Sequence, residues 1–219
     1  MAGLVITPIT VGGFAENAYL LVDSGTARAI FVDPGAEGDR LTAAVQAAGA
    51  TLEAIWLTHA HVDHVGGIAA LRRAFPGVPI HLHPLDRPLY DRAAATAAAY
   101  GLTGFEGPPD PDRDLSEGQV LMLGEARFEV LHVPGHAPGH VLFVGREAVF
   151  GGDLLFAGSI GRTDLPFSNP THMAASLGRA ANLPAHLAVY PGHGPPTTIG
   201  AELTGNPYLR LSRPTAVAQ

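Results

Sequence analysis

The chain is 219 residues long and 47% apolar, which is enough for one domain with a substantial core and excludes a disordered protein. Its formal net charge is −7 and its thirteen basic residues are scattered arginines, so the composition argues against nucleic-acid partners and anionic membranes. Lysine and cysteine are absent, which excludes Schiff-base catalysis, thiol nucleophiles, thiolate ligands and disulfides.

The start of the chain has neither the basic region nor the apolar stretch of a signal peptide. No run approaches the ~18 consecutive apolar residues of a membrane span. We therefore expect a cytoplasmic protein that binds no membrane.

The first half of the chain alternates strand and helix patterns. Strands are predicted over residues 4–11, 18–22, 29–32 and 52–58. Helices are predicted over residues 40–48, 68–75 and 85–100. The proline-rich residues 103–113 are expected to form a loop of the same fold, near the active site, and not a linker between domains.

The second half repeats this arrangement. Several strand patterns lie between residues 119 and 150, and a helix is predicted over residues 170–181. Two strand-rich halves that are each followed by helices predict an α/β sandwich. We expect a single domain over residues 1–219, with no clear pattern after residue 211.

Four metal-ligating side chains lie within the six-residue run His59-Ala60-His61-Val62-Asp63-His64. The run connects a buried strand pattern with a helical pattern, so its side chains enter one cleft from two directions. Imidazole suits zinc and iron, and a carboxylate offsets part of the metal charge. One tetrahedral ion does not need four ligands from so short a segment, so the run predicts two ions side by side. The alternative is a polar loop in which histidines cluster by chance.

Three further candidate ligands each stand at the end of a hydrophobic run. They are His136, Asp153 and His193, and each follows Pro-Gly or Gly-Gly. This repeated context favours a metal site over a chance cluster. The expected cofactors are two divalent metal ions, zinc first, with iron or manganese as alternatives, because sites of His and Asp accept several metals.

The ligand set indicates hydrolysis. Zinc lowers the pKa of bound water to about 7, so a hydroxide that bridges two ions can act as the nucleophile. Both ions would stabilise the oxyanion of a tetrahedral intermediate, and the catalytic carboxylates Asp63 and Asp153 leave them residual positive charge. A thiol with a pKa of about 8.5 leaves without a strong general acid, and no spare acid is evident near the ligands. A thioester or activated ester is therefore favoured over an amide or a β-lactam.

The chain resembles the metallo-β-lactamase superfamily in the motifs Thr58-His-Ala-His-Val-Asp-His64, Pro134-Gly-His136, Gly152-Asp153 and Pro191-Gly-His193. The resemblance covers nearly the whole chain, including Asn17-Ala-Tyr-Leu and Val32-Asp33-Pro-Gly35. It implies an αββα sandwich with a metal cleft at one edge of the sheets. It also implies the ligand sets, namely His59, His61 and His136 for the first ion, Asp63, His64 and His193 for the second, and Asp153 between both.

Within the superfamily the chain looks like the short bacterial form of glyoxalase II, hydroxyacylglutathione hydrolase. The similar segments are Gly158-Ser-Ile-Gly-Arg162-Thr-Asp164-Leu-Pro, Pro195-Pro-Thr-Thr-Ile-Gly200 and Asn206-Pro-Tyr-Leu209. The resemblance implies a small-molecule thioester substrate such as S-lactoylglutathione. Full-length glyoxalase II has a C-terminal helical region that contacts glutathione, whereas only residues 194–219 follow His193 here. We therefore expect no separate glutathione-binding domain, and the acyl group, the thiol carrier and the oligomeric state stay open.

Three other functions stay open as well. A mononuclear iron persulfide dioxygenase on the same scaffold also shows Gly-Arg-Thr-Asp, and its iron would use the positions of His59, His136 and Asp153. The remaining ligand positions are present in that family too, so the ligands do not decide between the two functions. The segments that begin at Pro195 and Asn206 favour the hydrolase. A metal-free binding protein has no physical need for seven ligands, and the acidic charge disfavours an RNA-processing nuclease.

Two contacts with the substrate are predicted. Arg162 is a bidentate donor of the type that binds a substrate carboxylate, or it pairs with Asp164 instead. Phe14, in the Gly12-Gly13 turn, either lines the cleft or caps the core.

Several polar residues have structural explanations. His81 and His83 share one face of a strand, and a second metal site there would need a third ligand that the neighbouring sequence lacks. His140 is expected beside the ligands in a structural role. Asp33 either orients a ligand through its carboxylate or is a plain turn residue.

Overall fold

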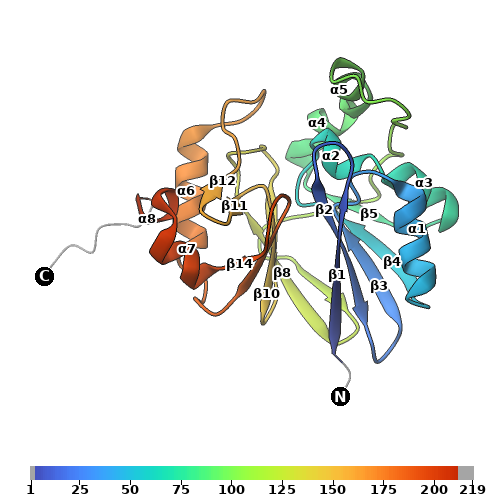
Figure 1. The fold of residues 1–219 in the computed structure, drawn as a ribbon, viewed down its shortest axis with the longest axis horizontal. Coiled ribbons are helices and arrows are strands. Elements are labelled where there is room, and N and C mark those ends of the chain that lie inside the picture. The colour runs from blue at the N-terminus through green and yellow to red at the C-terminus, as the bar shows by residue number, and fades with distance from the viewer. Residues whose placement is uncertain (1–2, 212–219) are drawn as a thin grey trace, which may run out of the picture.

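The two strand-rich halves of the sequence form two six-stranded mixed sheets that lie face to face (Figure 1). In spatial order, the first sheet consists of β1 (Leu4–Val11), β2 (Glu16–Asp23), β3 (Arg28–Val32), β4 (Thr51–Trp56), β5 (Ile80–Leu82) and β6 (Arg113–Asp114). In spatial order, the second sheet consists of β14 (Thr197–Thr198), β13 (Ala188–Pro191), β10 (Ala148–Gly152), β9 (Val141–Val144), β8 (Ala126–His132) and β7 (Val120–Leu123). The computed structural model describes residues 3–211, so the expectation for the tail after residue 211 lies outside the described residues.

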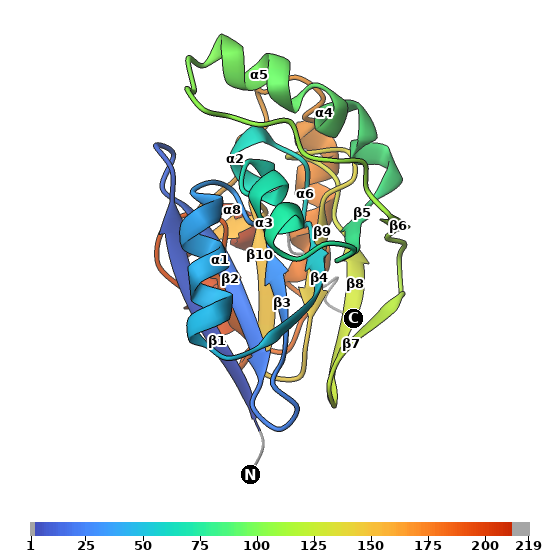
Figure 2. The same cartoon turned by 90° about the vertical axis from the view of Figure 1, so that its right-hand side faces the viewer.

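Helices cover the outer face of each sheet, as Figure 2 shows for the first sheet. The helices beside the first sheet are α1 (Gly38–Ala47) and α3 (Ile68–Ala74). Those beside the second sheet are α6 (Pro170–Ala180), α7 (Ile199–Gly205) and α8 (Pro207–Leu211). Three further helices stand beyond one end of the sheets, namely α2 (Val62–Val65), α4 (Arg87–Asp91) and α5 (Ala93–Ala99). Within residues 3–211, none of the helices combines the length and apolar character that crossing a bilayer requires.

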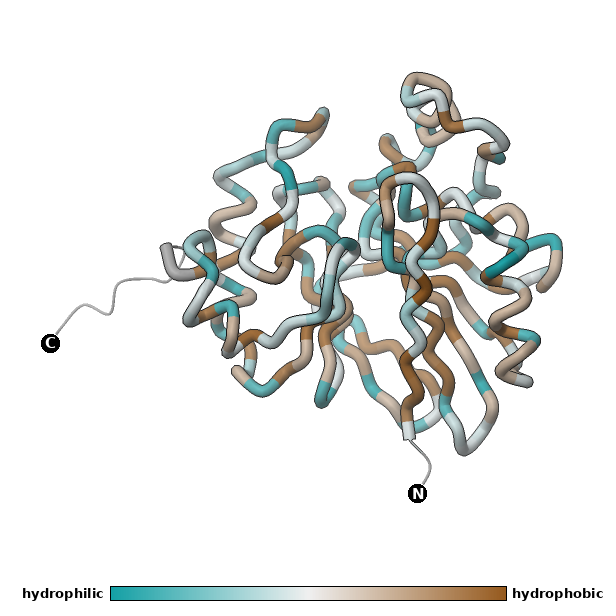
Figure 3. Tube along the Cα trace, in the orientation of Figure 1, coloured by the Kyte–Doolittle hydropathy of each residue, from teal (hydrophilic) through white to brown (hydrophobic). Residues whose placement is uncertain are grey.

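Strand β3 shows why the chain forms four layers. Ala29 and Phe31 pack into the core between the first sheet and its helices, whereas Ile30 and Val32 pack between the two sheets. Alternate side chains of a strand point to opposite faces, so a strand that is buried on both sides is apolar throughout. Figure 3 shows hydrophobic segments along the strands of both sheets. The predicted αββα sandwich is confirmed.

The prediction of one continuous helix over residues 85–100 is wrong. This segment forms a 3₁₀ turn, η1 (Pro84–Asp86), followed by α4 and α5. Pro88 cannot donate the backbone hydrogen bond of a helix interior, so α4 begins beside it. Arg92 joins α4 to α5 with φ −94° and ψ 0°, outside helical geometry. The alanine spacing predicted the helical character but not this junction.

A short hairpin of β11 (Leu155–Phe156) and β12 (Ser159–Ile160) was not predicted from the sequence. Two side chains hold it in place, one from α7 and one from the residue between α7 and α8. The Glu202 carboxylate accepts a hydrogen bond from the Gly158 N–H (2.9 Å), and the Asn206 amide donates to the Ser159 carbonyl (2.9 Å). The segment that begins at Asn206 therefore supports the hairpin that follows β10.

Candidate metal centre

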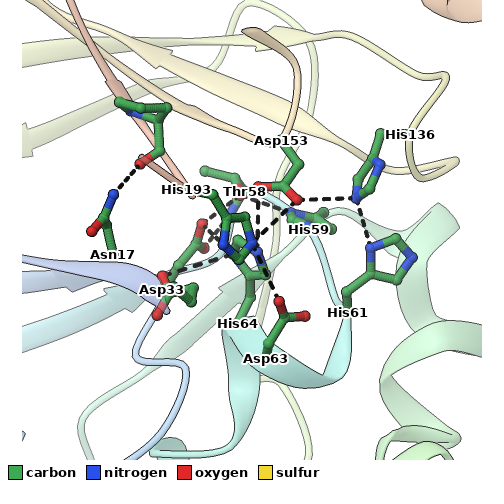
Figure 4. A network of polar contacts seen from close by, with 12 residues as sticks. Asn17, Asp33, Thr58, His59, His61, Asp63, His64, His136, Asp153 and His193 are labelled. Atoms are coloured by element: carbon green, nitrogen blue, oxygen red, sulfur yellow. Dashed lines mark hydrogen bonds and ion pairs between the residues drawn. The ribbon is translucent and has the colours of Figure 1, made fainter. Parts of the chain in front are cut away.

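The segment after β4 brings four of the candidate ligands to one point. His59 lies in the connection between β4 and α2, and His61 precedes α2 in an extended conformation. Asp63 and His64 belong to α2 itself. The strand end and the helix start that the sequence predicted are both present, and they present these side chains from different directions (Figure 4).

The second sheet supplies three more ligands from its own strand ends. His136 lies between β8 and β9, Asp153 directly follows β10, and His193 follows β13. Because β10 and β13 are parallel neighbours, their ends meet at the same edge. Gly152 has φ +46°, and a Cβ there would lie 2.3 Å from the Thr58 hydroxyl, so glycine is required to bring Asp153 this close to the other ligands.

The seven residues form two sets of three with Asp153 between them. The nitrogens of His59, His61 and His136 lie within 4.8 Å of one another, as do the ligand atoms of Asp63, His64 and His193. Asp153 Oδ2 lies 3.4 Å from His136 Nε2 and 3.5 Å from His193 Nε2. Asp153 Oδ1 lies 3.5 Å from His64 Nε2. The structure thus brings together the sets that the resemblance implied.

Three of these atoms are buried and, among the described residues, have no hydrogen-bond partner. They are His59 Nε2, His64 Nε2 and Asp153 Oδ1. Buried polar atoms are almost always hydrogen-bonded, so convergent atoms without partners indicate a site that binds a ligand. His61 Nδ1 also faces His136 Nε2 at 2.8 Å, nitrogen to nitrogen. This arrangement fits two metal ions, which would accept all of these lone pairs.

The opposite ring nitrogens are held by the protein. His136 Nδ1 lies 2.8 Å from the Arg162 carbonyl, and His193 Nδ1 lies 3.1 Å from the Phe14 carbonyl. His59 Nδ1 lies 3.0 Å from the Thr58 hydroxyl. Such partners fix the orientation and the tautomer of metal-binding imidazoles. The site is therefore organised by the chain alone.

Asp33 orients a ligand and is more than a turn residue. Its carboxylate accepts hydrogen bonds from the Thr58 N–H (2.7 Å) and the Thr58 hydroxyl (2.5 Å). Its Oδ2 also lies 3.0 Å from His64 Nδ1. Of the two expectations for Asp33, the structure therefore supports the orienting role. His140 likewise has the structural role expected of it, since its Nε2 accepts a hydrogen bond from the Asp153 N–H (3.1 Å).

The charges around the site favour cations. Burial lowers the pKa of His59 and lowers that of His61 to about 3, which leaves both imidazoles neutral and able to bind a metal. Burial also acts to lower the pKa of His64, but the nearby carboxylates, Asp153 first, outweigh it and raise the pKa. Burial acts to raise the pKa of Asp153, but His64 outweighs it and lowers the pKa. A proton on His64 thus supplies positive charge that bound metal ions would supply instead.

A cavity of about 410 Å³ opens directly over the ligands. Ligand residues form its base, and its walls are mostly apolar and aromatic: Phe14, Val62, Leu89, Tyr100, Phe156, Leu165, Pro166 and Phe167. Phe14 therefore lines the cleft, where its ring meets Tyr100 edge-on at 5.6 Å. Arg162 also lines the cleft, but its guanidinium pairs with Asp164 through two contacts of 2.9 Å. The structure shows the pairing of Arg162 with Asp164, and contact with a substrate carboxylate stays a prediction.

Comparison with known proteins identifies the family. The model of the Metallo-beta-lactamase superfamily matches residues 11–193. The chain belongs to this superfamily. Hydroxyacylglutathione hydrolase GloC of Haemophilus influenzae is 38% identical over 210 residues, 93% of this chain and 96% of that protein. The crystal structure of TTHA1623 in a di-iron-bound form is 48% identical, with a TM-score of 0.85 over 92% of this chain and 99% of that one. The BLEG-1 B3 metallo-beta-lactamase structure is 36% identical, with a TM-score of 0.85 over 94% and 99%.

Two buried carboxyl groups at this superfamily site were not identified from the sequence. Asp86 accepts hydrogen bonds from the N–H groups of Ala60 (2.9 Å) and Gly139 (2.5 Å), and burial raises its pKa to about 7. It therefore joins the two loops that carry ligands. Glu16 is 1% exposed and lies 3.9 Å from His64 Nδ1, and burial raises its pKa. Neither position belongs to a recognisable motif.

The pair His81 and His83 does not form a second centre. Among the described residues, every group that could hold a metal ion belongs to the site above. His83 stacks on His132 at 4.3 Å, and its Nδ1 accepts a hydrogen bond from the Leu85 N–H. The structural explanation of this pair is therefore the one that the structure supports.

Proposed function

We propose that this superfamily member is a dinuclear metal-dependent hydrolase of thioesters, and that its substrates are hydroxyacylglutathione-like, such as S-lactoylglutathione. The observation that carries the proposal is the position of the Asp153 carboxylate between two three-residue ligand sets at the base of an apolar cleft. Similarity to the hydroxyacylglutathione hydrolase GloC supports the substrate class.

The seven ligand candidates divide between two ions. His59, His61 and His136 would hold the first, Asp63, His64 and His193 the second, and Asp153 both. Zinc fits this donor set, and similarity to a di-iron-bound structure supports iron as an alternative, with manganese also possible for such ligands. When bound, the two ions would make a water molecule nucleophilic at neutral pH and stabilise negative charge on the substrate carbonyl oxygen.

The walls of the cleft favour a thioester. Among the described residues, no carboxyl or imidazole group lines it apart from the ligand candidates. A thiol, with a pKa of about 8.5, leaves as the thiolate without a proton donor, whereas an amide nitrogen must be protonated as it leaves. We therefore favour a thiol leaving group over the nitrogen of a β-lactam.

The ligand positions alone do not separate the hydrolase from a mononuclear iron dioxygenase, because that family has them as well. The segments that begin at Pro195 and Asn206 favour the hydrolase. In this chain His64 is oriented by Asp33, and His193 faces the Phe14 carbonyl. These contacts organise a second metal position before any ion arrives.

The test begins with protein purified without added metal or chelator. We expect elemental analysis to find close to two ions per chain, and S-lactoylglutathione to release free thiol in a spectrophotometric assay. Asp153→Asn should lower kcat at least about 100-fold, because it weakens a ligand of both ions. Near-normal turnover with full metal content would refute the bridging role. One iron per chain, with oxygen consumed in the presence of a persulfide, would overturn the proposed hydrolysis.

A further inference from the structure

Two arginines line the cleft, and they differ in how their charge is balanced. Both nitrogens of the Arg162 fork face Asp164, which neutralises this guanidinium. Arg92 forms no ion pair with any carboxylate among the described residues, and its guanidinium carbon lies 5.6 Å from the centre of the Phe167 ring. Arg92 is therefore a free cation on the wall of the cleft.

The lack of a partner is unusual for this chain. Nine described arginines form ion pairs with acidic side chains, namely Arg28, Arg40, Arg72, Arg73, Arg87, Arg127, Arg146, Arg162 and Arg179. Arg113 likewise forms no ion pair among the described residues, but it does not line the cleft. Acidic residues outnumber basic residues, 20 to 13, so a shortage of carboxylates does not explain why Arg92 is unpaired. An unpaired guanidinium beside a ligand-binding cavity is available to an anionic group from outside the chain.

Arg92 and Phe167 come from two different segments that both line the cleft. Arg92 stands at the junction of α4 and α5, whereas Phe167 and Arg162 belong to the loop between β12 and α6. In Figure 1 these two segments rise on either side of the ligand-bearing strand ends. One cavity is lined by Arg92 and also by His61 and Asp153, so a single molecule can reach the guanidinium and the metal ligands together.

Phe167 orients Arg92 without neutralising it. Phe167 has φ +70°, a left-handed conformation that is strained for a bulky residue, and its side chain stays 45% exposed. Burial in the core therefore does not explain this conformation. A cation that covers the face of an aromatic ring is stabilised there and keeps its N–H donors for other partners.

We propose that Arg92 binds a carboxylate of the thiol carrier while the thioester carbonyl lies over the metal ligands. The inference rests on the proposed hydrolysis of thioesters and specifies the carrier: a peptide thiol with a free carboxylate, such as glutathione. Arg162 remains paired with Asp164 and is not the anion-binding residue. Arg92 is thus a specificity-determining residue, and Phe167 is the residue that positions it.

The kinetic test compares two substrates with one acyl group. The first is S-lactoylglutathione, and the second is the lactoyl thioester of N-acetylcysteamine, whose carrier has no carboxylate. We expect Arg92→Gln to lower kcat/KM for the glutathione thioester relative to the neutral thioester by about 10- to 100-fold, mainly through KM. Arg92→Lys should recover part of the ratio. Arg113→Gln is the control. Arg113 also forms no ion pair, but it does not line the cleft, so this variant should keep the wild-type ratio.

A binding measurement tests the proposal without any turnover of substrate. The probe is S-methylglutathione, a thioether that cannot be hydrolysed, titrated calorimetrically into metal-loaded protein. We expect the wild type and Arg113→Gln to bind it, and Arg92→Gln to bind it at least about 10-fold more weakly. Equal affinity of wild type and Arg92→Gln would overturn the proposal, and so would the absence of binding to the wild type. Arg92-dependent binding without any thioester hydrolysis would instead refute the proposed function and leave the carboxylate site standing.

Discussion

Replacing Asp33 with asparagine tests whether the chain itself organises the second metal position. The asparagine carbonyl can still accept the hydrogen bond of the Thr58 N–H, and the Thr58 hydroxyl can rotate to accept one from the new amide group. His64 has no such option. Its Nδ1, which lies 3.0 Å from the carboxylate, would face an NH₂ group that cannot accept its proton. The imidazole must then turn or carry its proton on Nε2, the nitrogen that faces Asp153.

The magnitude follows from the one interaction that is lost. A hydrogen bond to a charged group contributes about 1.5–3 kcal/mol, which corresponds to a factor of about 10 to 150 in an equilibrium constant. We therefore expect Asp33→Asn to weaken the binding of one ion about 10- to 150-fold. The other ion, held by His59, His61 and His136, should keep its affinity within about threefold, because Asp33 forms no direct hydrogen bond with these three residues.

Chelator competition on the metal-loaded protein, combined with elemental analysis, measures the two affinities separately. Asp39→Asn is the matched control, because Asp39 is exposed in the first turn of α1 and distant in sequence from every ligand. Two ions bound with wild-type affinities by Asp33→Asn would refute the reasoning. Equal weakening of both ions would also contradict it, since that result would indicate a general loss of structure.

Three further changes probe the support around the site. Burial raises the pKa of Asp86 from 3.8 to about 7, so folding favours its protonated form, and its contribution to stability is lost as the pH rises through this range. Urea unfolding should therefore show a smaller fall in the free energy of unfolding between pH 4 and pH 7 for Asp86→Asn than for wild type. Asn206→Ala removes the donor to the Ser159 carbonyl and should lower the free energy of unfolding by about 1–3 kcal/mol and raise KM, because the hairpin carries Phe156 on the cleft wall. Removal of metal with a chelator should lower the thermal midpoint by about 10 °C in calorimetry, and an unchanged midpoint would argue against metal ions bound at the buried carboxylates.

The base of the site could be predicted from the sequence because each of its parts is local. His59, His61, Asp63 and His64 stand within one short run, and the other ligands each follow a hydrophobic strand. Strand ends gather at a sheet edge whatever the details of packing, so the ligands were expected to meet. Their division between two ions came from the resemblance to the superfamily and not from spacing, and the geometry agrees with it.

The supporting carboxyl groups could not be predicted in the same way. Asp86 contacts the backbone N–H groups of residues 26 and 53 positions away, and such contacts leave no periodicity in the sequence. Glu16 begins β2 with no ligand motif around it, although it is fully buried beside His64. The Ala-rich segment that contains Arg92 suggested an unbroken helix, whereas the junction between α4 and α5 places this residue on the cleft wall.

Chemistry and specificity therefore reside in different parts of the molecule. The ligand candidates occupy strand ends that two sheets position together, so their arrangement persists as long as the sandwich does. Much of the wall comes from α4, α5 and the loop between β12 and α6, where single side chains can change without disturbing either sheet. A glutathione thioester hydrolase and a β-lactamase are similarly related to this chain, so overall similarity does not select a substrate. The choice must instead be made by wall residues that contact the leaving group, and among the described arginines of the cleft Arg92 alone has its charge free for that purpose.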